Sequence, residues 1–326
     1  MAESTHMTFP TPQFFRHDGF RHAFYESGPA DGPPIIFVHG WPEMAYSWHA
    51  QMTALAAAGY HAICYDLRGF GQSDAPLEVE HYGIANIVSD LEALMDHLGL
   101  ERTVICGHDW GGIIVWHAAR MLGARITNVI SISTPHVRRA PADPIAIFRQ
   151  RHGDDHYFVD FNDHVGRSDA LFATDPESFF RLTFRSTAGG TKLKSAHTHM
   201  AVNFARHLSA GRPDLDGAVM GDADFKIFGD AYARSGFHGG LNLYRNTTAN
   251  WKLAEGLSET VTQISLMISP EDDVFLPPAF ADQMVDTVPN LTRKLIPDCG
   301  HWAMWEKPEA INAAILEWLS DLDLTP

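Results

Sequence analysis

The sequence is poor in cysteine, in long apolar runs and in basic residues. Only three of its 326 residues are Cys. They are too few for a disulfide framework or a cysteine-rich zinc site, and an odd number fits a reducing compartment. No uninterrupted apolar run reaches the roughly 18 residues of a membrane-spanning helix. The N-terminus has neither the basic nor the apolar region of a secretory signal. We therefore expect a soluble, cytoplasmic protein.

The scarcity of basic residues bears on possible partners. Lys and Arg number 24 against 40 Asp and Glu, which gives a net charge of −16. Such a chain repels phosphate backbones and anionic lipid surfaces, so we expect neither a nucleic acid nor a membrane as partner. Hydrophobic residues make up 45% and charged residues 20%, as in ordinary globular proteins. At about 150 residues per domain, the length indicates about two domains.

Short apolar runs and helical patterns alternate at both ends of the chain and stop in its middle. The pattern predicts strands at 35–38, 61–65, 103–106, 128–133, 264–268 and 291–296, and helices at 84–98, 111–122 and 308–319. Alternating strands and helices form parallel sheets. The irregular residues between them are rich in His, Asp, Arg and Phe. The sequence therefore predicts an α/β core domain of residues 1–135 and 251–326, with a mostly parallel sheet, interrupted by a helical cap domain of residues 136–250.

The sharpest local pattern joins a predicted strand to a predicted helix. Residues 106–112 read Cys-Gly-His-Asp-Trp-Gly-Gly, the small-residue context of a nucleophile elbow, in which a tight turn exposes one reactive side chain. Asp109 occupies the reactive position. The alternative is an Asp that only caps the following helix. A charge at the end of a buried strand is costly unless it is paired or used, which favours a nucleophile.

Two further residues follow Asp109 in the chain order nucleophile, acid, histidine. His301 comes after the predicted strand 291–296 and is a candidate base, and Asp272 or Asp273 follows strand 264–268 as a candidate acid. These patterns leave the choice between the two acids open. His-Gly-Trp-Pro-Glu follows the first buried strand, where Trp41 could donate a backbone N–H to an oxyanion together with the N–H of Trp110.

At this point the sequence resembles the α/β-hydrolase family, and within it the soluble epoxide hydrolases, over nearly the whole chain. The matching segments are 39–43, Tyr-Asp-Leu-Arg-Gly-Phe-Gly-Gln-Ser-Asp at 65–74, 107–112 and Asp-Cys-Gly-His-Trp at 298–302. The resemblance implies that Asp273 is the acid. It also implies two active-site tyrosines from the cap, Tyr244 in segment 235–246 and Tyr157 in segment 157–162. Asn162 stands where the family has Gln.

A carboxylate nucleophile limits the reaction. Its attack on an ester would give an anhydride that reverts, whereas its attack on a saturated carbon gives a stable ester, which water activated by His301 can hydrolyse. An epoxide oxygen leaves as a basic alkoxide and needs a proton donor, such as a phenol with a pKa near 10. Asp109, His301, Asp273, Tyr157 and Tyr244 therefore predict an epoxide hydrolase that forms a vicinal diol.

Two alternatives remain open. A haloalkane dehalogenase would use the same Asp nucleophile, but many of those enzymes carry Asn where Trp41 stands, and fluoroacetate dehalogenases carry Arg where Trp110 stands. A non-catalytic protein could hold a small ligand in the same pocket. Aromatic side chains predicted to line an apolar pocket are Phe158, Phe161, Phe275 and Trp302.

The sequence implies neither a metal nor an organic cofactor. It has no dinucleotide fingerprint and no phosphate-binding P-loop. His152 and His156 have a spacing that metal ligands use, but a chain with 19 His produces such pairs by chance. The expected partners are therefore a small apolar epoxide and water. The sequence does not indicate the oligomeric state.

Overall fold

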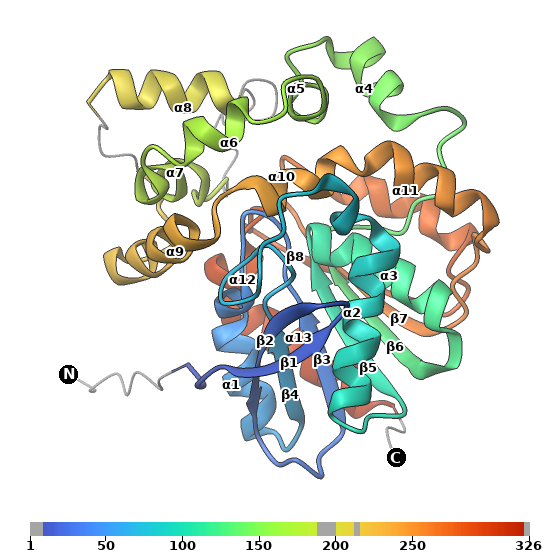
Figure 1. The fold of residues 1–326 in the computed structure, drawn as a ribbon. Helices are drawn as coiled ribbons and strands as arrows, with labels where there is room; N and C mark the ends of the chain where they lie inside the picture. The colour runs from blue at the N-terminus through green and yellow to red at the C-terminus, as the bar shows by residue number, and fades with distance from the viewer. Residues whose placement is uncertain (1–8, 188–199, 212–215, 323–326) are drawn as a thin grey trace.

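The computed structural model describes residues 9–187, 200–211 and 216–322 (Figure 1). Within these residues eight strands form one sheet in the order β1-β2-β4-β3-β5-β6-β7-β8. The strands are β1 Gln13–His17, β2 Phe20–Ser27, β3 Pro34–Val38, β4 His61–Tyr65, β5 Thr103–His108, β6 Ile126–Ile132, β7 Ile264–Pro270 and β8 Leu291–Ile296. β2 pairs antiparallel with β1 and β4, and every other neighbouring pair is parallel. The predicted mostly parallel sheet is confirmed.

The central strands are buried on both faces because helices cover the sheet from both sides. Alternate residues of a strand point to opposite faces. Ile36 of β3 packs into a cluster with α2 (Ile84–His97) and α3 (Trp110–Leu122). Its neighbour Phe37 packs with α1 (His49–Ala57) and α13 (Pro308–Ser320) on the other face. This two-sided burial explains why these strands read as continuous apolar runs.

A set of helices follows β6 and precedes β7 in the chain, and it covers the carboxyl end of the sheet (Figure 1). They are α4 Pro144–His152, α5 Tyr157–Asp163, α6 Arg167–Phe172, α7 Pro176–Thr183, α8 Met200–Ser209, α9 Asp222–Ser235, α10 His238–Arg245 and α11 Thr247–Leu253. The short α12 (Ala303–Glu306) follows β8. The helices fall in the predicted cap, but α11 crosses residue 250, and the division into two domains stays a prediction.

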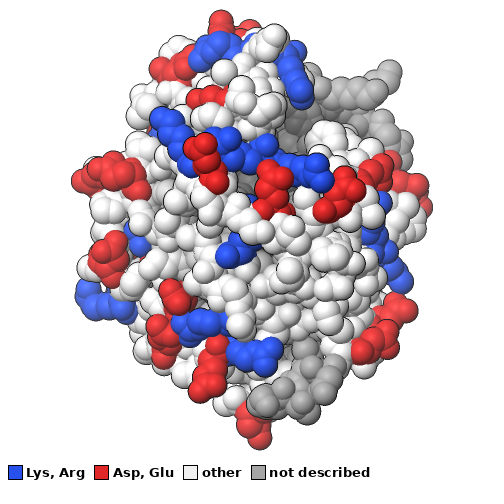
Figure 2. All heavy atoms as spheres, turned by 90° about the vertical axis from the view of Figure 1, so that its right-hand side faces the viewer, with Lys and Arg blue, Asp and Glu red and all other residues white. Residues whose placement is uncertain are grey.

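The cap helices and the core share one apolar cluster. Trp41 of the core contacts the cap helices within this cluster: its ring lies 5.9 Å from those of Phe161 and Phe179 and 5.4 Å from that of Tyr244, measured between ring centroids. No helix in the described part of the chain is long and apolar enough to cross a membrane. Figure 2 shows acidic and basic side chains interspersed over the face that it presents.

Candidate active site

Asp109 lies at the sharp turn between β5 and α3. Its backbone has φ of 52° and ψ of −119°, a strained conformation that persists only where the surrounding structure imposes it. Gly111 permits the turn, because a Cβ atom there would lie 1.9 Å from the carbonyl oxygen of Val38. The turn presents the Asp109 side chain at the carboxyl end of the sheet, in the position that the elbow pattern predicts.

The Asp109 carboxylate faces hydrogen-bond donors on two sides. Its Oδ1 accepts the backbone N–H of Trp41 at 2.8 Å, and the backbone N–H of Trp110 also donates to the carboxylate. Its Oδ2 lies 3.8 Å from Nε2 of His301. Burial raises the pKa of Asp109, against the opposing effect of His301, His108 and the two N–H groups. The sequence argument did not anticipate this effect of burial.

Asp273 is the acid that contacts the imidazole. Its Oδ2 accepts a hydrogen bond from Nδ1 of His301 at 2.8 Å. Its Oδ1 accepts the backbone N–H groups of Phe275 and Leu276 at 2.8 and 2.9 Å. Burial alone would raise the pKa of Asp273, but His301 and these donors hold it below its usual value. The structure therefore places Asp273, rather than Asp272, against the histidine.

His301 lies between two carboxylates and is only 3% exposed. Burial lowers the pKa of an imidazole, but the carboxylates of Asp273, Asp109 and Glu43 together raise the pKa of His301 to about 9. At neutral pH the imidazole of the free protein is therefore protonated, and it pairs with Asp109.

Glu43 and His108 form a buried pair behind this group, and the sequence argument assigned neither a role. Glu43 Oε2 accepts the backbone N–H of Gly40 at 2.6 Å and lies 3.0 Å from Nδ1 of His108. Nε2 of His108 lies 2.9 Å from the carbonyl oxygen of His301. Both ring nitrogens of His108 therefore face oxygen atoms in the buried core. Glu43 and His108 are 65 residues apart in the chain, so no local sequence pattern predicts their contact.

Tyr157 and Tyr244 come from α5 and α10 and lie side by side, with ring centroids 5.5 Å apart. Both line the cavity that contains Asp109. Burial and the nearby Asp109 carboxylate raise the pKa of both phenols, so each keeps its proton at neutral pH. A side-chain hydrogen bond from Trp110 opposes this shift in the pKa of Tyr244.

The cavity above Asp109 measures about 450 Å³ and is mainly apolar. Its described lining contains no Lys, Arg or Glu, and Asp109 is its only carboxylate. The predicted lining residues Phe158, Phe275 and Trp302 are among those that surround it. Residues that sequence reasoning missed are Pro42, Ile113, Thr134, Phe148, His152, His156, Thr183, Met200, Val274, Leu276, Pro277 and Phe280.

The prediction that Phe161 lines the cavity is wrong. Its side chain is fully buried and does not belong to the described lining. Its ring packs instead between Trp41 and Phe172, at centroid distances of 5.9 and 6.2 Å. On the short helix α5, Tyr157 and Phe158 face the cavity. Phe161 lies one turn further along, and this places its ring in the seam between cap and core.

The comparisons with known proteins agree with this geometry. A family model described as the alpha/beta hydrolase fold matches residues 33–308. Epoxide hydrolase A of Mycobacterium tuberculosis is 34% identical over 98% of this chain and 100% of its own length. Bifunctional epoxide hydrolase 2 of Sus scrofa is 32% identical over 92% of this chain, which matches 53% of that longer protein.

The solved structures give the same answer. The crystal structure of epoxide hydrolase A from Mycobacterium thermoresistibile superimposes with a TM-score of 0.87 and 30% identity, over 97% of this chain and all of the other. Identity of this level over the full length, together with the shared fold, places the chain in the α/β-hydrolase family, in the branch that contains the epoxide hydrolases.

Proposed function

We propose that this chain hydrolyses epoxides to vicinal diols through a covalent ester on Asp109. The observation that carries the proposal is the joint position of three groups around one apolar cavity. A carboxylate held by backbone N–H groups faces a histidine paired with a second carboxylate, and two phenols from the cap line the same space. The related proteins named above are epoxide hydrolases, which supports the same reaction here.

In the first step an oxygen of Asp109 attacks an epoxide carbon from the side opposite the ring oxygen. The new bond joins the carboxylate to carbon, the carbon–oxygen bond of the epoxide breaks, and the oxygen takes a proton from Tyr157 or Tyr244. Because the pKa of both phenols is raised, neither loses its proton before the leaving oxygen develops charge.

Esterification of Asp109 lowers the pKa of His301, and the imidazole gives its proton to solvent. In the second step the neutral His301 removes a proton from water, and the hydroxide attacks the ester carbonyl. The resulting oxyanion is stabilised by the N–H groups of Trp41 and Trp110, which already bind the free carboxylate. The diol leaves with the proton from His301. The acid left on Asp109 then ionises, and solvent returns a proton to the tyrosine.

The change in charge at Asp109 gives the order of these steps. In the free protein the negative Asp109 helps to raise the pKa of His301 to about 9. Esterification makes Asp109 neutral, so this contribution disappears and the pKa of His301 falls. The histidine is therefore a poor base before the ester forms and a better base after it.

The cavity indicates the class of substrate. A described lining rich in Phe and Trp, with no Lys or Arg and with the charge of Asp109 paired to His301, favours an uncharged, apolar epoxide. A halide leaving group is disfavoured, because it needs side-chain N–H donors. The indole N–H edge of Trp41 packs against α10, where a Cβ on Gly240 would lie 2.2 Å from Nε1, and the Trp110 side chain bonds to Tyr244. A cytoplasmic location stays a prediction.

Single turnover in ¹⁸O-labelled water tests the ester. With protein in excess over styrene oxide, label should enter the Asp109 carboxylate first and reach the diol only in later turnovers, as mass spectrometry of peptides would show. Asp109→Asn should form no diol while its circular dichroism stays unchanged. Asp230→Asn, on the exposed surface of α9, is the matched control. Label in the diol from the first turnover would refute the ester route.

A further inference from the structure

Glu306 accepts hydrogen bonds from the backbone N–H groups of the residues on both sides of His301. It is the last residue of α12, and its carboxylate folds back over the loop that carries the histidine. Its Oε2 accepts the N–H of Gly300 at 3.0 Å, and its Oε1 accepts the N–H of Trp302 at 3.2 Å. One carboxylate therefore holds the N–H groups of Gly300 and Trp302, the residues before and after His301 in the chain, and so limits the movement of the loop that carries the histidine.

The same carboxylate is tied to the cap. Ser186, which follows α7 in the chain, donates its hydroxyl to Oε2 of Glu306 at 2.5 Å. Gly300 makes this approach possible, because a Cβ there would lie 2.3 Å from Oγ1 of Thr187 and 2.7 Å from Oε1 of Glu306. A cap segment thus lies directly on the histidine loop.

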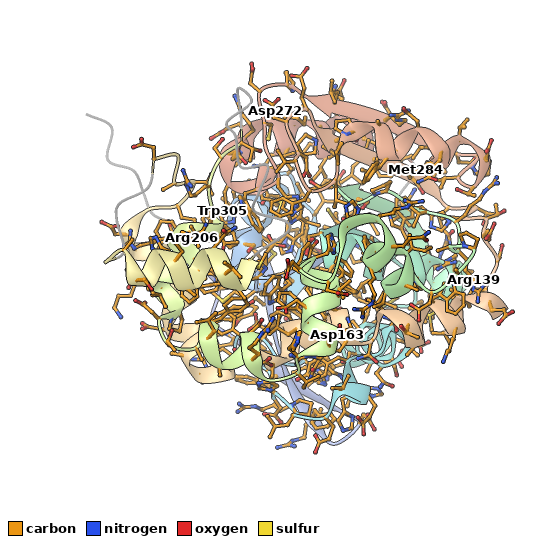
Figure 3. All side chains as sticks on the ribbon, turned by 90° about the horizontal axis from the view of Figure 1, so that it is seen from above. Arg139, Asp163, Arg206, Asp272, Met284 and Trp305 are labelled. Carbon is orange, nitrogen blue, oxygen red and sulfur yellow. The ribbon has the colours of Figure 1, made fainter. Side chains whose placement is uncertain are left out.

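Residues 183–187 of the cap contact both loops that carry the histidine–acid pair. The Trp302 indole donates to the carbonyl oxygen of Thr183 at 2.9 Å and stacks on Phe184, with ring centroids 4.0 Å apart. Thr187 donates its hydroxyl to the carbonyl oxygen of Asp272 at 2.7 Å. Figure 3 views this region from the cap side and labels Asp272 and Trp305, the chain neighbours of Asp273 and Glu306.

We propose that Glu306 is a positioning residue for His301: it fixes the imidazole against Asp273 and couples its position to the cap through Ser186. This inference rests on the proposed function, in which His301 acts on the ester. Glu306 does not touch the cavity, whose described lining includes His301 and Trp302 but not Glu306.

Glu306 acts through geometry rather than through its charge. Burial lowers the pKa of His301, and the largest effects that raise it come from Asp273, Asp109 and Glu43 rather than from Glu306. Replacement of Glu306 should therefore keep the largest electrostatic contributions at the imidazole and mainly change its orientation. A misplacement of about 1 Å can reduce the rate of a positioned reaction by about 100-fold.

The two half-reactions separate this role from a general structural one. Attack by Asp109 does not need His301 as a base, whereas hydrolysis of the ester does. A loose histidine loop should therefore slow hydrolysis and spare ester formation. Stopped-flow tryptophan fluorescence can follow both phases, because Trp41 and Trp110 lie beside Asp109.

The experiment compares Glu306→Ala, Glu306→Gln and Ser186→Ala with the unmodified protein, using styrene oxide. We expect ester hydrolysis to fall about 10- to 100-fold in Glu306→Ala and less in Glu306→Gln, which keeps one acceptor oxygen, while ester formation changes less than about twofold. Ser186→Ala should give a smaller loss in the same phase. Glu309→Gln, on the exposed first turn of α13, should match the unmodified protein in both phases.

An equal loss in both phases, or unchanged hydrolysis in Glu306→Ala, would overturn the positioning role. If the unmodified protein formed no ester at all, the proposed function would fail instead.

An NMR measurement without substrate tests Glu306 independently of the proposed function. The Nδ1 proton that His301 shares with Asp273 should give a low-field NMR signal, identified by its loss in Asp273→Asn. That signal should broaden in Glu306→Gln and persist unchanged in Glu309→Gln. A sharp, unshifted signal in Glu306→Gln would contradict the proposed positioning role of Glu306.

Discussion

At the scale of single residues, the two cap tyrosines differ in their surroundings. Tyr244 is almost fully buried, is flanked by Trp41 and Trp110, and receives a hydrogen bond from the Trp110 side chain. Tyr157 is partly exposed and stacks beside His156, with ring centroids 4.9 Å apart. Burial and the Asp109 carboxylate outweigh the Trp110 hydrogen bond and raise the pKa of Tyr244 overall. The two indole rings and this hydrogen bond nevertheless hold the Tyr244 side chain in place, so we expect Tyr244 to contribute more to ring opening than Tyr157.

Replacement of either tyrosine should slow ring opening. General acid catalysis contributes about 10²- to 10⁴-fold to a rate. Because a second phenol remains, we expect Tyr157→Phe to lower the rate of ester formation by about 10-fold and Tyr244→Phe by about 100-fold. The double variant should lose more than either alone. Stopped-flow measurement of the first phase checks this, with Tyr60→Phe, which lies outside the cavity lining, as control. An unchanged rate in the double variant would exclude the phenols as donors.

At the scale of elements, the junction of β5 and α3 depends on close backbone approach. In Gly111→Ala the new methyl group would meet the Val38 carbonyl at 1.9 Å. Alanine favours a helix by about 1 kcal/mol over glycine, but overpacking costs about 1–3 kcal/mol and occasionally more. Because the clash is with backbone rather than with a flexible side chain, the upper end of the overpacking cost applies, and we expect a net loss of about 2 kcal/mol in the free energy of unfolding, measured by urea denaturation. Gly256→Ala, where a Cβ meets nothing within 4 Å, should change it by less than about 0.5 kcal/mol. Equal values for the two variants would contradict this account.

The elements of the core were predictable because their patterns are local. Strands 61–65 and 291–296 have the predicted bounds, and the helix predicted at 308–319 differs from α13 by one residue. The strand predicted at 103–106 extends to His108 in the structure, because Gly107 and His108 still pair with β6. The prediction stopped short because these two residues belong to the elbow pattern. The cap was predicted only as helical. Its helices are short, and contacts between distant segments decide their ends.

At the scale of the whole molecule, the candidate site combines segments from six parts of the chain, which contribute Trp41, Asp109, Tyr157, Tyr244, Asp273 and His301. The order and context of Asp109, Asp273 and His301 could be read from the sequence, because each follows a predicted strand. The partners that hold them could not. Glu306 and Glu43 act through contacts with backbone N–H groups and with side chains that no local pattern records. For the same reason the lining prediction failed at Phe161, whose direction depends on how the cap packs on the core.

The buried pair of Asp273 and His301 should also make the stability of the whole protein depend on pH. The pKa of His301 is raised from 6.5 to about 9, so its stabilising contribution is complete below about pH 6.5 and is lost as the pH rises through about 9. The pKa of Asp273 lies below its usual value of 3.8, so its contribution is present above about pH 4 and is lost as the pH falls further. The pair should therefore stabilise the fold most between about pH 4.5 and 6.5.

The difference in the free energy of unfolding between the unmodified protein and Asp273→Asn isolates this effect, because groups outside the pair contribute almost equally to both proteins. Urea denaturation at several pH values should give the largest difference between about pH 4.5 and 6.5, and smaller differences near pH 3 and above pH 9. Glu309→Gln should show no such maximum, because Glu309 lies on the exposed surface. A difference that grows steadily toward high pH would mean that His301 is neutral in the free protein. The order of steps proposed here, in which esterification of Asp109 releases the histidine to act as a base, would then be wrong.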